Sequence, residues 1–204
     1  MPKMPQTMNI MMQLKTHTTD NHKQLEKSRF FKRLFASDYS VAEYANLIAY
    51  FYSYFNAIEK QIFADLPIEY HSYLEHRHKT PLLYQDLIAL GVNTQELTRC
   101  EILPVLPTFA KKMGAFYVLE GSLLGGRVIA RHLKNQLGTT IENALNFYSC
   151  YGEDLNTQWQ TFGLFMGECF DNSPNEISNE IIAAANATFN SLQCWLETDA
   201  ITIR

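Results

Sequence analysis

The sequence contains little of what marks several large classes of protein. Only 19% of its 204 residues are charged, and the formal net charge is -4 at pH 7. A general nucleic-acid-binding protein usually shows a strong basic excess, so this composition predicts no nucleic-acid partner. The chain has only nine glycines and seven prolines. Together with the lack of continuous runs of alternating polar and apolar residues, this disfavours an all-β fold.

Long apolar segments and paired cysteines are also missing. No stretch approaches the roughly 18 uninterrupted apolar residues of a membrane span. The N-terminal residues are interrupted by Pro2, Lys3, Pro5 and Gln6, which leaves no apolar core of signal-peptide length. The four cysteines are widely spaced and form no Cys-x-x-Cys pair: Cys100, Cys150, Cys169 and Cys194. They are typical of reduced thiols, and we expect a cytoplasmic protein without a membrane span.

What the sequence does contain is a large apolar share, arranged mostly at helical spacing. Hydrophobic residues make up 47%, enough for a sizeable core, and the length favours one domain over residues 1–204, with residues 1–8 as a flexible tail. We predict an all-α fold. The expected helices cover about 9–35, 40–64, 80–91, 114–137 and 141–151, with one more after Asp154 and a last one after Pro174. Capping boxes are expected from Ser40 with Glu43 and from Ser173 with Glu176.

The first predicted helix carries a histidine with polar neighbours one turn away on each side. Thr18 precedes His22 by one turn and Glu26 follows it by one turn, so the three share a face, on which Lys15 also lies. A carboxylate one turn from a histidine can hold a ring N–H and orient the imidazole, as a metal-ligating histidine requires. Taken alone, the pattern fits an ordinary interfacial histidine better than a metal ligand.

The predicted helix over 114–137 contains three glycines in its middle, where each costs roughly 1 kcal/mol relative to alanine. Gly121 and Gly125 are four residues apart and share a face with Tyr117. A face without side chains lets a ligand lie directly on the helix backbone. Small residues four apart also let two helices pack closely, and this stretch alone does not decide between the two interpretations. The adjacent Gly126 also favours a kink.

Three segments together resemble the heme oxygenase family. Residues 14–26, which read Leu-Lys-x-x-Thr-x-x-x-His-x-x-x-Glu, are similar to its proximal helix. Residues 117–126, Tyr-Val-Leu-Glu-Gly-Ser-Leu-Leu-Gly-Gly, resemble its glycine-rich distal helix in the form found in bacterial and phytochrome-associated members. Residues 151–153, Tyr-Gly-Glu, followed by Trp159, also resemble the bacterial branch. The resemblance implies a single-domain, multi-helix fold with a heme slot between the first helix and the glycine-rich central helix.

On the proximal side of the slot, the resemblance implies roles for four residues. His22 would ligate the heme iron as a neutral imidazole and so be the metal ligand and a catalytic residue. Glu26 would accept the other ring N–H and fix the orientation of the imidazole. Lys15 matches a position that pairs with a heme propionate, and Thr18 would belong to the same heme-binding set.

On the distal side, Gly121, Gly125 and Gly126 would let the helix backbone approach the porphyrin. Ser122 stands where mammalian-type members carry an aspartate that holds a water molecule; a serine hydroxyl can hold water but supplies no charge. The cations expected late in the chain for the second propionate are missing from residues 158–162. The other heme contacts that the resemblance implies are Tyr117, Arg127, Arg131 and Phe189, with Lys134 and Arg29 as cations that could replace the missing ones.

The activity implied by the resemblance is that of a heme-degrading monooxygenase, an oxidoreductase that opens heme to biliverdin and releases carbon monoxide and iron. Heme would be both substrate and cofactor, dioxygen the oxidant, and an external reductase (a ferredoxin, a flavodoxin or an NADPH-linked enzyme) the electron donor. A phytochrome could receive the biliverdin. Two alternatives stay open. One is a heme-binding or heme-carrying protein of the same fold without turnover. The other is a thiamin-degrading or quinone-forming relative, which would not need His22 with Glu26 behind it.

Overall fold

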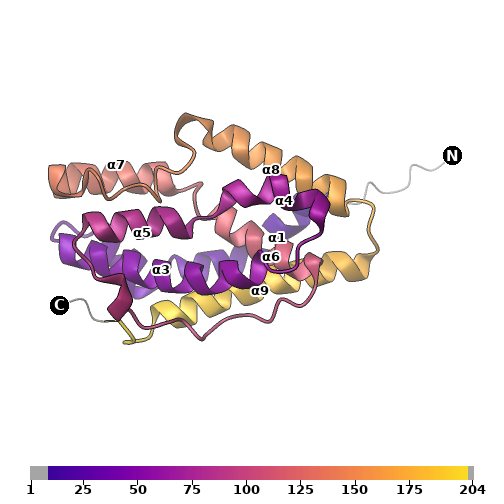
Figure 1. Ribbon diagram of the computed structural model, residues 1–204, viewed down its shortest axis with the longest axis horizontal. Helices are drawn as coiled ribbons and strands as arrows, with labels where there is room; N and C mark the ends of the chain where they lie inside the picture. Colours follow the sequence, from indigo (N-terminus) through magenta and orange to yellow (C-terminus); the bar gives the residue numbers. More distant parts are fainter. Residues whose placement is uncertain (1–8, 202–204) are drawn as a thin grey trace.

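The computed structural model describes residues 9–201, and all regular elements within this range are helical, which confirms the predicted all-α fold. The expected flexible tail, residues 1–8, lies outside the described residues. Within the described range, no helix is both long enough and apolar enough to cross a membrane. The α-helices, labelled in Figure 1, are α1 (Ile10–Leu25), α2 (Arg29–Leu34), α3 (Val41–Ile62), α4 (Ile68–Leu74), α5 (Thr80–Ala89), α6 (Phe109–Gly121), α7 (Gly126–Leu137), α8 (Leu155–Phe170) and α9 (Asn175–Leu196).

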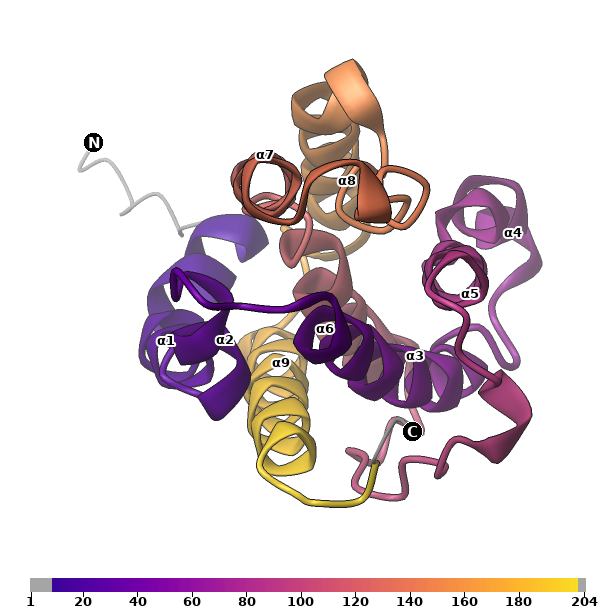
Figure 2. The same cartoon turned by 90° about the vertical axis from the view of Figure 1, so that its left-hand side faces the viewer.

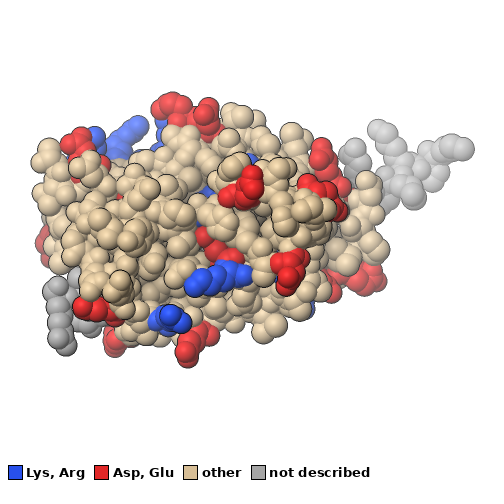
Figure 3. Space-filling view, in the orientation of Figure 1, with Lys and Arg blue, Asp and Glu red and all other residues tan. Residues whose placement is uncertain are grey.

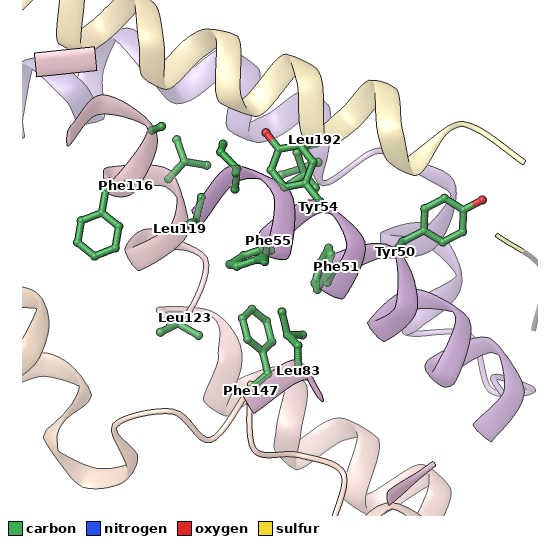
Figure 4. Close-up of a cluster of buried hydrophobic side chains, with 14 of the residues drawn as sticks. Tyr50, Phe51, Tyr54, Phe55, Leu83, Phe116, Leu119, Leu123, Phe147 and Leu192 are labelled. Atoms are coloured by element: carbon green, nitrogen blue, oxygen red, sulfur yellow. The ribbon is translucent and has the colours of Figure 1, made fainter. Parts of the chain in front are cut away.

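Three helices, α3, α6 and α9, form the centre of the fold. α6 packs along α9 and against α3, while α1 packs on α9 and α5 packs on α3. Figure 2 shows α1 and α2 on one side of this centre, α4 and α5 on the other, and α7 and α8 above it. Buried apolar side chains from the three central helices meet in the core, joined by Phe147 from the segment between α7 and α8 (Figure 4).

The contact between α6 and α9 is so close that it requires a glycine. A Cβ atom at Gly114 would lie 2.2 Å from the backbone oxygen of Ile181 and 3.1 Å from the Cβ of Ala184. Phe116 and Leu119 are almost fully buried in the same helix, so their face of α6 enters the core.

The prediction of one helix over about 9–35 is wrong, because the chain turns after Leu25. The turn carries short-range hydrogen bonds, from Lys27 N to Gln24 O (3.0 Å) and from Ser28 N to Leu25 O (3.0 Å). The next residue, Arg29, is drawn towards the C-terminal segment: its backbone N–H donates to Glu197 Oε1 (3.0 Å) and its guanidinium pairs with Asp199. A contact with residues far along the chain thus ends α1, and no local glycine or proline marks the break.

The prediction of one continuous helix over 114–137 is also wrong. α6 ends at Gly121, residues 122–125 form turns, and α7 begins at Gly126. Across the break the hydrogen bonds shorten to three-residue steps, from Leu124 N to Gly121 O (3.1 Å) and from Gly126 N to Leu123 O (2.8 Å). The glycines therefore do more than kink the segment, because they divide it into two helices.

The two predicted capping boxes have opposite outcomes. The first is confirmed: Ser40 Oγ accepts a hydrogen bond from Glu43 N, and Glu43 Oε2 accepts one from Ser40 N. The second is wrong, because α9 begins at Asn175 with Pro174 in the cap position and no side-chain cap bond forms. A proline side chain has no acceptor for the free N–H groups of the first turn.

No α-helix forms over about 141–151, where one was predicted; the segment holds only a 3-10 turn and other turns. The reason is a buried carboxylate on α5. Asp86 accepts hydrogen bonds from Asn146 N (2.7 Å), Asn146 Nδ2 (2.8 Å) and Phe147 N (2.9 Å). These two backbone N–H groups are thereby withdrawn from helical partners.

Candidate functional site

The outer face of the break between α6 and α7 is open and apolar. A Cβ atom at Gly125 would meet no atom within 4 Å. Beside it, Leu124 is 42% exposed and Val128 is 67% exposed. These two exposed side chains are available for contact with an apolar ligand. For Gly125, the structure therefore favours the open-face interpretation over close helix packing.

The other two glycines of the motif face protein atoms. A Cβ atom at Gly126 would lie 2.8 Å from the backbone oxygen of Tyr148, so this glycine permits close packing. At Gly121 the same atom would lie 3.7 Å from the Trp159 ring, which is ordinary contact. The two interpretations left open by the sequence thus apply to different glycines of one motif.

On α1, the predicted ligand His22 lies at the surface, with a side chain that is 57% exposed. Its Nδ1 atom lies 3.6 Å from Glu26 Oε1, which is an ion-pair distance rather than a hydrogen bond. The imidazole and the Phe189 ring pack in a T-shaped arrangement, with ring centroids 5.7 Å apart. Among the residues that the structure describes, nothing bonds to the other ring nitrogen, Nε2, which leaves it free for a ligand.

The position of α1 is set by α9 and by α6. Asn21, next to His22, donates from Nδ2 to Asn186 Oδ1 (2.6 Å), and Asn186 Nδ2 donates back to His17 O (3.1 Å). On the other side, buried Thr18 lies against the hydroxyl of Tyr117 on α6, and burial raises the pKa of that phenol. The histidine helix and the glycine helix therefore meet one turn from His22.

The predicted cations differ in whether they already have an ion-pair partner in the protein. Arg127 pairs with Glu153 (2.8 Å) in an exposed salt bridge, and Lys134 pairs with Glu142 (3.4 Å). Arg29 is bound by Asp199 and by two carbonyls of the C-terminal segment. Within residues 9–201, Lys15 and Arg131 are exposed and make no ion pair. They are the cations of the predicted set that are available for an anionic ligand.

Ser122, the residue after Gly121, already uses its hydroxyl proton in a hydrogen bond to its own helix. Ser122 Oγ donates to Leu119 O at 2.6 Å, so the single hydroxyl proton is used and only acceptor positions remain. An ordered water could donate to this oxygen but could not receive a proton from it in this arrangement. Ser122 itself is exposed, as a contact to a ligand in the slot would require.

A cavity of about 720 Å³ lies between α3 and α5 and is lined in part by Tyr52, Phe63 and Tyr84. The side of the molecule in Figure 3 is mostly uncharged, with acidic and basic side chains scattered over it. In residues 9–201 no three His, Cys, Asp or Glu side chains gather to hold a metal ion.

Sequence reasoning missed a buried group of charges behind the glycine motif. Glu120, the residue before Gly121, is ion-paired with Arg77 and Lys79, and all three side chains are at least 95% buried. Tyr151 lies against them. Glu120 and Tyr151 belong to the motifs at residues 117–126 and 151–153. The signal that could have identified them was a charged or polar residue among apolar neighbours.

Comparisons with known proteins point to one family. The family model described as heme oxygenase matches residues 8–198. A heme oxygenase from Xanthomonas campestris pv. campestris is 32% identical over 127 residues, which cover 62% of this chain and 72% of that protein.

Among solved structures, the chain is similar to heme oxygenase-1 from the cyanobacterium Synechocystis in complex with heme, with a TM-score of 0.73 and 20% identity over 93% of this chain and 91% of that one. The heme oxygenase from Leptospira interrogans gives a TM-score of 0.71 and 17% identity over 93% and 98% of the two chains. At these identities the structural likeness shows the fold alone.

Proposed function

Since the chain belongs to the heme oxygenase family, we propose that it degrades heme, opening the porphyrin to biliverdin with release of carbon monoxide and iron. The observation that carries this proposal is an exposed histidine on α1 together with the open face at Gly125, in the turn that follows α6. Thr18 and Tyr117 lie against each other where α1 meets α6.

The residues present fit a flat, apolar ligand with two carboxylates. Exposed Leu124 and Val128 offer apolar contact, and the bare backbone at Gly125 allows close approach. Lys15 and Arg131 can meet carboxylates at the rim. Bound heme supplies both the iron that activates dioxygen and the porphyrin that is oxidised.

The protein's own groups orient the ligand and handle protons. Glu26, beside Nδ1, favours the tautomer in which Nε2 of His22 faces the ligand. Phe189 restricts rotation of the imidazole through its T-shaped contact. On the distal side, the oxygen of Ser122 can hold a water molecule, which supports proton delivery through ordered water. Electrons come from an external donor, a ferredoxin, a flavodoxin or an NADPH-linked reductase. The proposal includes a cytoplasmic, bacterial setting and transfer of biliverdin to a phytochrome.

Incubation of the purified protein with heme and an electron source tests this proposal directly. We expect the Soret band of bound heme to disappear as a biliverdin spectrum develops. A Soret band that persists would support the heme-carrier alternative, for which the uncharged Ser122 is the motivating feature. Failure to bind heme would exclude both activities and favour a thiamin-degrading or quinone-forming relative.

The His22→Ala variant tests the proximal ligand. We expect loss of biliverdin formation with weak residual heme binding, because apolar burial remains while the iron loses its protein ligand. The control is His17→Ala, which removes another exposed imidazole from the same helix. Added imidazole should restore the parent iron spectrum in His22→Ala. Normal turnover in that variant would exclude His22 as the ligand.

A further inference from the structure

A network of buried polar groups lies directly behind the end of α6. It consists of Arg77, Lys79, Glu120, Tyr151 and Gln158, and we call it the Glu120 cluster. The side chains of its three charged members are 5%, 0% and 1% exposed, for Arg77, Lys79 and Glu120 respectively. These residues come from the segment before α5, from α6, from the turn before α8 and from α8 itself.

The hydrogen bonds of the Glu120 cluster are nearly complete. Glu120 Oε1 accepts from Lys79 Nζ (2.6 Å) and lies 3.1 Å from the Tyr151 hydroxyl, and Oε2 accepts from Arg77 Nη1 (2.8 Å). An ammonium group has three donors. Lys79 Nζ donates its other two hydrogen bonds to Arg77 O (2.8 Å) and to the Tyr151 hydroxyl (2.7 Å). The carboxylate is therefore held from several directions at once.

This cluster is connected to the glycine motif in two ways. Glu120 directly precedes Gly121, the last residue of α6. In addition, Arg77 Nη2 donates to Gln158 Oε1 (2.9 Å), and the neighbouring Trp159 packs its ring on Gly121 and on Tyr117. The cluster therefore contacts both the end of α6 and the segment that carries the Trp159 ring packed on it.

Stability alone does not account for such an arrangement. Removing ions from water costs several kcal/mol each, and well-packed apolar side chains are often as stabilising as a buried ion network. The structure carries a further cost at the same place, since Tyr151 adopts a left-handed backbone conformation with φ of 66°. Directional charge pairs, unlike apolar contacts, fix the orientation and the position of the group that they bond.

We propose that Glu120 is a positioning residue, held by Arg77, Lys79 and Tyr151, that sets how the Gly121–Gly125 backbone lies over the ligand. The proposal rests on the proposed function, because that backbone forms the distal wall of the heme slot. A rotation of the α6 end would turn Gly121 and the residues that follow it in the same sense. The cluster thereby determines which edge of the porphyrin faces the wall, and hence which biliverdin isomer forms.

The sharpest variant is Tyr151→Phe, which removes one hydroxyl from the cluster and keeps the ring. Its matched control is Tyr73→Phe: the Tyr73 ring lies over the guanidinium of Arg77 (4.5 Å), and its buried hydroxyl has no hydrogen-bond partner among the described residues. Glu120→Gln is a second variant that keeps the shape and removes the charge. The control and the variants therefore touch the same cluster, but only the variants remove bonds from it.

Hydrogen exchange of the protein without heme gives the first readout. In Tyr151→Phe we expect the amides of residues 121–126 to exchange about tenfold faster, because a hydrogen bond to a charged network is lost. Tyr73→Phe should exchange like the parent. Unchanged exchange in Tyr151→Phe and Glu120→Gln would overturn the proposal, and this readout does not depend on heme turnover.

The heme-bound protein gives the second readout. We expect both variants to bind heme with little change in affinity, to alter the proton NMR spectrum of the ferric cyanide complex, and to produce a mixture of biliverdin isomers. Faster exchange with an unaltered spectrum and isomer ratio would make the cluster purely structural and overturn the proposal. A parent that binds heme without turnover would refute the proposed function, while the cyanide spectra would still decide the role of Glu120. A parent that binds no heme would refute both.

Discussion

The two halves of the glycine segment are packed in opposite ways. Most of α6 is buried against α9 and α3, whereas in α7 only Gly126 and Leu133 are buried. Beyond these, α7 is held by an exposed Arg127–Glu153 pair and by His132, whose Nε2 lies 3.2 Å from Leu34 O. Exposed ion pairs contribute little, about 0–1 kcal/mol. The comparison shows that the role of a glycine depends on what faces it, which is a neighbouring backbone at Gly114 and Gly126 and open space at Gly125, in the turn between the two helices.

The largest loss of stability is expected from Gly114→Ala, on the packed side of the comparison. The new methyl group would lie 2.2 Å from the backbone oxygen of Ile181, so α6 and α9 must separate. Overpacking costs about 1–3 kcal/mol, partly offset by roughly 1 kcal/mol of helix propensity. Thermal unfolding should show a clear fall in Tm. The control is Gly163→Ala, whose Cβ would only touch the flexible side chain of Met11 at 3.7 Å. Equal stability of the two variants would contradict the tight contact.

A smaller loss is expected from Gly126→Ala, at the first residue of α7. Its Cβ would lie 2.8 Å from Tyr148 O, which is close but needs less movement than at Gly114. We expect a loss of about 1 kcal/mol in the free energy of unfolding. Urea titration measures this value, and Gly125→Ala, in open space, is the control. A Gly126→Ala variant as stable as this control would mean that α7 does not pack closely against the Tyr148 backbone.

Gly125→Leu separates stability from activity. Because nothing lies within 4 Å of the position, and because Gly125 lies in the turn before α7 rather than in a helix interior, the protein without heme should be about as stable as the parent. Heme degradation should be lost, since the leucine side chain would fill the face that the ligand needs. Measurements of Tm and of biliverdin formation check the expected stability and the expected loss of activity. A much lower Tm with intact turnover would make this glycine a packing element and refute the slot.

Val128→Lys should have the smallest effect on stability. A substitution at a side chain that is already 67% exposed usually changes the free energy of unfolding by no more than about 0.5 kcal/mol. If α7 lines the slot, however, the charge should weaken heme binding, which a heme titration measures. Leu164→Lys, at a residue exposed to a similar degree on α8, is the control and should bind heme like the parent. Equal heme affinity in the two variants would place the ligand away from α7.

Much of the site was visible in the sequence because it depends on local spacing. His22 and Glu26 are one turn apart in any helix, and their side chains do meet, at 3.6 Å. Gly121 and Gly125 were singled out by their cost in a helix. Their heme-binding roles, like those of Lys15 and Arg131, remain predictions. The availability of each cation could not be predicted, because Arg127 pairs with Glu153, 26 residues away, and Arg29 with Asp199, 170 residues away.

The sequence by itself determined the helical class, the capping box at Ser40, the end of α7 at Leu137 and the two motifs of the candidate site. These features follow from side chains and backbone groups within about one helical turn of each other. Only the tertiary structure decided where α1 stops, which glycine is open and which is packed, and how Glu120 is held. Each of these depends on a partner far along the chain, Glu197, Tyr148 or Lys79, whose position exists only once the helices have packed.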